Sequence, residues 1–163
     1  MTNRWNRWKG AALGCAAAAL TIAGAMPAQA IAGASARSEA EQLRKLDIML
    51  MVTGLRCRTT AHDFRADFAA FEAAHLRDLN DAAAELRQGL VASAGVAGAA
   101  RALDRISTGM ANQYGQGHPW LDCAQLKQAT KALTRVKGRA ILVEAADQLL
   151  APQAGSQLAF VER

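Results

Sequence analysis

Histidine, cysteine and aromatic residues are all scarce in this chain of 163 residues. It has three histidines and three cysteines, and its aromatic content is 5%. His62, His75 and His118 are isolated from one another, and no two cysteines have Cys-x-x-Cys spacing, so neither common zinc-binding pattern is present. We therefore expect no metal site.

Sequence motifs for phosphate binding and nucleophilic catalysis are also missing. Gly115-Gln116-Gly117 lacks the preceding strand and the third glycine of a dinucleotide-binding fingerprint, no Walker lysine occurs, and there is no Gly-x-Ser-x-Gly elbow. The sequence therefore predicts no cofactor and assigns no catalytic residue. An enzyme remains an open alternative if catalytic residues that are far apart in the sequence come together in the folded chain.

The first 30 residues have the layout of a cleavable signal peptide. Three basic residues precede an Ala-rich apolar run from Ala11 to Met26, which is too short for a typical transmembrane helix, and small residues follow. Cleavage after Ala30 fits best, and Ala36 offers a second site. We expect a periplasmic protein with no membrane span in the mature chain.

The charge of the predicted mature chain is close to neutral. Residues 1–30 hold three of the 19 basic residues and none of the 14 acidic ones, so the remainder has a net charge of +2. Such a balance lacks the basic stripe that nucleic acid requires. We expect no nucleic-acid partner.

Removal of the leader leaves one pair of cysteines, Cys57 and Cys123. In an oxidising compartment, an even pair without metal-binding spacing indicates a disulfide. A crosslink that closes the long loop between Cys57 and Cys123 stabilises a fold by roughly 4 kcal/mol, because it restricts the unfolded chain.

Helical periodicity dominates the rest of the sequence. We predict a flexible connector over 31–36, a helical domain over 37–151 and a loose tail over 152–163. The first helix is expected to begin at Ser38, an N-cap with Glu41 three residues later. Its main seam is Leu43, Leu46, Leu50, Thr53 and Cys57, and further apolar residues make it the expected centre of the fold. A strand over 48–53 paired with 140–143 is the alternative.

Three or four more helices follow. A long amphipathic helix is expected from Thr60, with Asp63 as its capping partner, and Ser93-Ala94-Gly95 should end it. The expected core face of the third helix is Val96, Ala99, Leu103, Ile106 and Met110. That of the fourth helix is Trp120, Cys123, Leu126, Ala129, Leu133 and Val136. The last helical segment is expected to bury Ile141, Ala145 and Leu149. Gly115 should follow the third helix, Pro119 should lie in the first turn of the fourth, and Gly138 should bend or divide it.

Short connections between these helices favour an all-α, up-down bundle of four to five helices. In that topology the end of the first helix and the start of the fourth lie side by side. Cys57 and Cys123 lie at these two positions, so the topology and the predicted disulfide support each other.

Several polar and aromatic side chains that could bind a ligand should lie at this end of the bundle, which we call the disulfide end. Helix N-termini attract anions, and the arginines, histidines and tyrosine would add hydrogen-bond donors. Alternatively, the aromatic residues only plug the bundle. The candidate binding residues are Arg56, Arg58, His62, Tyr114, Gln116, His118 and Trp120. His75 lies on an apolar seam and is expected to be a packing residue.

Two stretches, Leu46–Arg58 and Met110–Pro119, carry a resemblance, together with Arg105-Ile106-Ser107 between them. Over about residues 40–150 the chain resembles a family of small exported alphaproteobacterial proteins that often carry the label S-adenosyl-L-homocysteine hydrolase. The resemblance implies export and the cysteine pair, and it supplies no catalytic residue. The Gly-rich motif after a strand that the NAD enzyme of that name would need does not occur in this chain.

A small, crosslinked, helical domain without catalytic motifs is typical of interaction modules. We expect a non-catalytic periplasmic binding or assembly protein of the cell envelope, whose partner is an envelope protein or a small anion. The alternatives are an inhibitor or immunity-type protein against a secreted hydrolase and a small hydrolase.

Overall fold

The computed structural model describes the backbone of residues 28–151 and the side chains of residues 35–151. Four helices follow one another: α1 (Ala28–Cys57), α2 (Arg65–Gln113), α3 (Cys123–Leu133) and α4 (Arg139–Leu150). No strand occurs among these residues. The predicted all-α class is confirmed, and the strand alternative is wrong because 48–53 and 140–143 are both helical.

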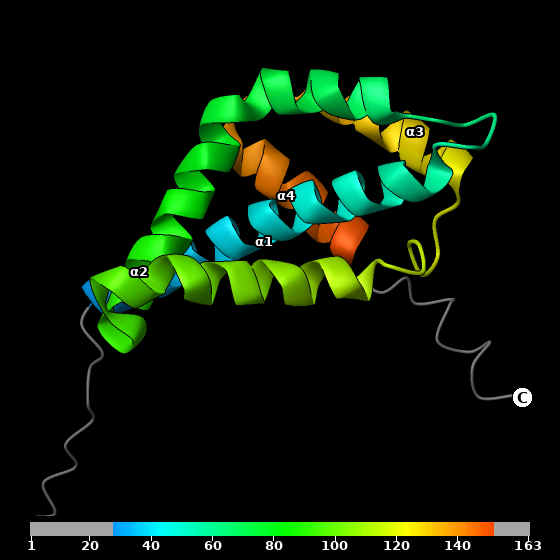
Figure 1. Ribbon diagram of the computed structural model, residues 1–163. Helices are drawn as coiled ribbons and strands as arrows, with labels where there is room; N and C mark the ends of the chain where they lie inside the picture. The colour runs from blue at the N-terminus through cyan, green and yellow to red at the C-terminus, as the bar shows by residue number, and fades with distance from the viewer. Residues whose placement is uncertain (1–27, 152–163) are drawn as a thin grey trace, which may run out of the picture.

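Helix α1 is the centre of the fold and contacts the other three helices (Figure 1). Every member of its predicted seam is buried: Leu43, Leu46, Leu50, Thr53 and Cys57. The helix is not covered all round, since Met51 and Leu55 are 42% and 49% exposed. One side of α1 therefore faces solvent.

Helix α2 bends twice and frames α1 (Figure 1). One bend is at Gly95, whose φ of 68° is accessible to glycine without steric cost. This confirms the predicted break. The other bend, at His75, has φ −118° and ψ 16°. The His75 side chain is buried, and its Nε2–H donates to the carbonyl of Leu133 at the end of α3 (2.9 Å).

Contacts along the chain show the up-down order. Arg37, near the start of α1, lies against Gly89, while Gly54 lies against Phe64, so the first part of α2 runs antiparallel to α1. After Gly95 the chain turns back, and α3 then runs antiparallel to α1 from the disulfide. Cys57 and Cys123 are bonded, with Cα atoms 5.7 Å apart, which confirms the predicted pair.

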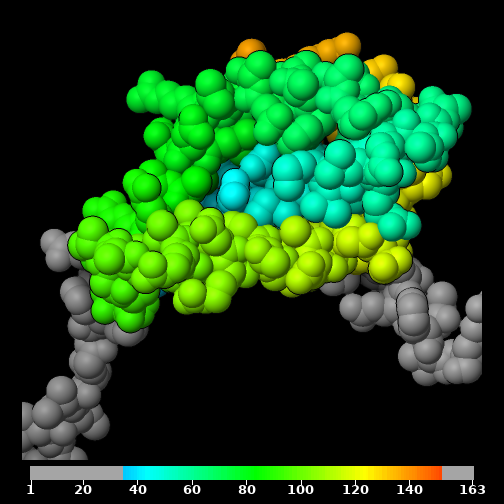
Figure 2. All heavy atoms as spheres, viewed as in Figure 1, coloured from blue at the N-terminus to red at the C-terminus, as the bar shows by residue number. Residues whose placement is uncertain are grey.

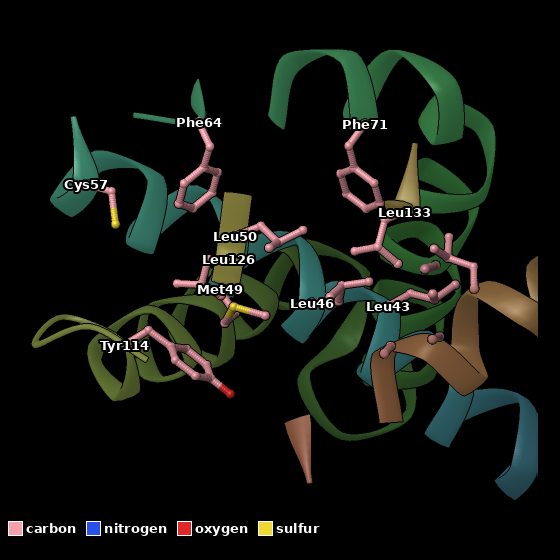
Figure 3. Packing of buried hydrophobic residues seen from close by; sticks show 14 residues of the cluster. Leu43, Leu46, Met49, Leu50, Cys57, Phe64, Phe71, Tyr114, Leu126 and Leu133 are labelled. Carbon is pink, nitrogen blue, oxygen red and sulfur yellow. The ribbon is translucent and has the colours of Figure 1, made fainter. Parts of the chain in front are cut away.

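The core is small and lies between α1 and its neighbours. Figure 3 shows side chains of α1 meeting Phe64 and Phe71 from the start of α2, and Leu126 and Leu133 from α3. All four of these side chains are buried. Few large side chains are available, so the disulfide adds a substantial share of the stability of a domain this size.

Several predicted helix ends are wrong. Helix α1 begins at Ala28, so the predicted connector is helical, and Ser38 lies inside the helix instead of capping it. Thr60 does not begin α2; its hydroxyl donates to the Cys57 carbonyl (2.8 Å) and closes the turn after α1. Pro119 lies in the loop before α3, because Asp122 supplies the N-cap. Gly115 does follow the C-cap of α2, as expected.

The predicted core faces after Gly95 are only partly right. Val96 is 82% exposed next to the bend, while Ala99 is buried, since its small side chain permits close packing. Gly138, with φ 90°, precedes α4 and separates it from α3, as predicted. The buried residues of α4 are Leu142 and Ala146, and Ile141 is 57% exposed.

The first 27 residues of the predicted signal peptide and the predicted tail lie outside the described residues. Within the described part, no helix is both long and apolar enough to span a membrane.

Candidate functional site

His118 organises the loop between α2 and α3. Its Nδ1 accepts hydrogen bonds from the backbone N–H groups of Trp120 (3.4 Å) and Leu121 (3.2 Å), and its Nε2–H donates to the Leu149 carbonyl of α4 (3.2 Å). Burial lowers the pKa of His118, and the hydrogen bond to Leu149 partly offsets this. The ring is therefore neutral, and both its nitrogens are occupied by structural contacts.

Aromatic packing surrounds this histidine. Tyr114 stacks on His118 with ring centroids 5.8 Å apart, and Trp120 approaches it edge-on at 4.8 Å. Tyr114 is buried, and burial raises the pKa of its hydroxyl. Among the described residues, the Trp120 Nε1 has no hydrogen-bond partner. These contacts join the end of α2, the loop and α4. They agree with the alternative in which the aromatic residues only close the end of the bundle.

Among the remaining candidate residues of the disulfide end, Arg56 is the one whose side chain hydrogen-bonds to a distant segment of the described chain. Arg56 Nη1 donates to the Gly115 carbonyl (2.9 Å) and ties α1 to the loop. Arg58 directly follows α1, and its Nη1 donates to the carbonyl of Leu55 in the last turn of that helix (2.8 Å). The side chains of Arg58, His62 and Gln116 are exposed, and no hydrogen bond in the described chain connects them.

The start of α3 is already capped. Asp122 accepts a hydrogen bond from the Gln125 backbone (2.8 Å), and the Gln125 side chain accepts one from the Asp122 N–H (2.9 Å). A carboxylate thus occupies the position where we expected free N–H groups to attract an anion. The Asp-x-x-Gln spacing is the sequence signal that could have predicted this cap.

A second candidate surface lies on the open side of α1. Figure 2 shows atoms of α1 at the floor of a recess bordered by the segments of α2. Part of this recess is a hollow of about 240 Å³, which we call the apolar hollow. Its lining residues are Arg37, Glu41, Leu86, Gly89, Leu90, Leu103 and Ile106.

A largely buried carboxylate, Asp47, lies farther along α1. Arg44 Nη1 donates to Asp47 (3.1 Å), and Arg44 Nε donates to Ser107 of α2 (3.3 Å). Burial is the main cause that raises the pKa of Asp47 to about 6; nearby Glu72 adds to the rise, and Arg44 opposes it. The sequence signal for this group was an aspartate within an apolar helix.

The described residues contain no group of three or more histidine, cysteine or acidic side chains that could hold a metal ion. No family model, curated protein or solved structure matches this chain. The fold of the described residues is a disulfide-crosslinked up-down helical bundle in which one side of α1 is open.

Proposed function

We propose that this protein is a non-catalytic binding or assembly protein of the cell envelope, exported to the periplasm through its N-terminal leader. The observation that carries the proposal is the apolar hollow. Leu86, Leu90, Leu103 and Ile106 form an apolar wall that remains open to solvent. Open apolar surfaces beside polar residues are typical of interaction sites.

The geometry of the histidines also favours binding over catalysis. A general base needs a free nitrogen within hydrogen-bond reach of its substrate. His118 uses both nitrogens within the fold, and His75 is buried with Nε2 on the Leu133 carbonyl. His62 is the one exposed histidine, so a hydrolase with a histidine base would depend on it.

The disulfide supports the proposed location. A crosslink between Cys57 and Cys123 persists in oxidising compartments such as the periplasm. It also holds α1 against α3 at one end, so that the bundle is stabilised while one face of α1 stays open.

Affinity capture from an envelope fraction tests the proposed function. The mature chain should retain a stoichiometric envelope component, identified by mass spectrometry of both proteins and lipids. Ile106→Asp, which introduces a charge into the hollow, should abolish retention. Ile141→Asp is the matched control, because Ile141 is similarly exposed but lies on α4, outside the residues that line the hollow.

Two results would contradict the proposal. One is capture of nothing in stoichiometric amount, and the other is turnover of a substrate by the purified chain. If the captured component is a secreted hydrolase that loses activity in the complex, the protein is an inhibitor or immunity-type member of the same binding class.

A further inference from the structure

We propose that the apolar hollow binds the acyl chain of a zwitterionic single-chain amphiphile, with Arg37 on its phosphate and Glu41 on its ammonium group. The inference rests on the proposed binding function and names the ligand class of the same surface.

The size of the hollow favours one short chain. Pockets for drug-sized ligands occupy roughly 300–1,000 Å³, whereas this hollow is about 240 Å³ and opens to solvent. Its apolar wall consists of leucine and isoleucine side chains from two segments of α2, on either side of the Gly95 bend. A single acyl chain fits this volume, and the head group must remain at the opening.

Charges of both signs lie at the opening. Arg37 and Glu41 are one helical turn apart on α1 and both are exposed, yet they form no ion pair with each other or with any other described residue. Arg37 makes one long hydrogen bond, from Nη2 to the Gly89 carbonyl (3.5 Å), which leaves most of its donors available. A ligand with only an acidic head would meet repulsion from Glu41, whereas a zwitterionic head matches both side chains.

The other charged side chains near the hollow are either hydrogen-bonded within the protein or border a separate groove. Glu85, also near Arg37, is held by both terminal nitrogens of Arg139 (2.7 and 3.0 Å). Arg44 is bound to Asp47 and Ser107. Lys45 borders a separate polar groove that shares Glu41 with the hollow. Arg37 and Glu41 are therefore the charged pair that lines the hollow itself.

Gly89 allows Arg37 to take this position. A Cβ atom there would lie 2.8 Å from Arg37 Nη2 and 3.1 Å from Nε. Gly89→Ala should therefore displace the guanidinium without disturbing the helix backbone, because the atoms that must move are the far end of a flexible side chain.

Isothermal titration with decanoyl lysophosphatidylethanolamine tests the inference, with decanoate and decylamine as comparison ligands. The disulfide-bonded chain should bind the zwitterionic ligand saturably and at least about tenfold more tightly than either comparison ligand, since each charge-assisted contact contributes roughly that factor. Arg37→Gln should lower affinity about tenfold and shift the preference towards decylamine. Glu41→Gln should shift it towards decanoate.

Arg77→Gln is the matched control, because it removes the same charge from a side chain that is 93% exposed and does not line the hollow. Circular dichroism would show whether each variant is folded. The inference is wrong if the zwitterionic ligand does not saturate, if decanoate binds equally well, or if Arg37→Gln and Arg77→Gln behave alike. An Ile106-dependent protein partner together with no amphiphile binding would preserve the proposed function and overturn only the ligand.

Discussion

Asp47 should make the stability of this protein depend on pH in a direction opposite to that of most carboxylates. Its pKa rises from 3.8 to about 6 in the folded chain, mainly because the group is buried. The folded state therefore holds the proton more tightly than the unfolded state. Between these two pKa values, rising pH removes the proton and lowers the free energy of unfolding.

The magnitude follows from the same shift. One pKa unit corresponds to about 1.4 kcal/mol, so the shifted pKa of Asp47 lowers the free energy of unfolding by about 3 kcal/mol at pH 7.5 and by about 1 kcal/mol at pH 4.5, relative to a group that stays protonated in both states. Asp47→Asn removes the charge and keeps an oxygen that can accept the Arg44 hydrogen bond. We expect the variant to be more stable than the parent by these amounts, and so by about 2 kcal/mol more at pH 7.5 than at pH 4.5.

Urea unfolding followed by circular dichroism at the two pH values measures this difference. Asp104→Asn, at an exposed aspartate of α2, is the matched control and should leave the difference between the two pH values unchanged. An equal gain for Asp47→Asn at both pH values, or a loss at pH 7.5, would show that burial does not dominate the energetics of this carboxylate.

Three further predictions concern the crosslink, the disulfide end and the bend in α2. Cys57→Ser should lower the free energy of unfolding by about 4 kcal/mol, and recovery of both parent thiols free in periplasmic material would contradict the bond. Trp120→Ala should cost about 3 kcal/mol and Arg58→Ala less than about 0.5 kcal/mol in urea titrations; loss of envelope capture with Arg58→Ala would instead make the disulfide end a binding site. Gly95→Ala should destabilise by about 1 kcal/mol, because its φ is 68°, whereas Gly109→Ala, in regular helix with open space around it, should stabilise by up to about 1 kcal/mol; the same sign for both would refute the conformational argument.

The buried seam of α1 follows from the sequence because helical periodicity is a local property. Leu43, Leu46 and Leu50 recur on one face, and any neighbouring helix buries that face. The break at Gly95 and the division at Gly138 are also local, since glycine readily adopts positive φ. The Cys57–Cys123 bond required one further step, namely the topology that short connections impose.

Only the tertiary structure decides which neighbour covers each remaining face. The bend at His75 depends on a carbonyl 58 residues later in the chain, and no local pattern encodes that contact. Burial of Asp47 and the hydrogen bond from His118 Nε2 to the Leu149 carbonyl likewise depend on segments that meet after folding. The apolar hollow exists because α2 turns back at Gly95 beside α1 and leaves Ile106 partly uncovered; periodicity alone predicted that this residue would lie in the core.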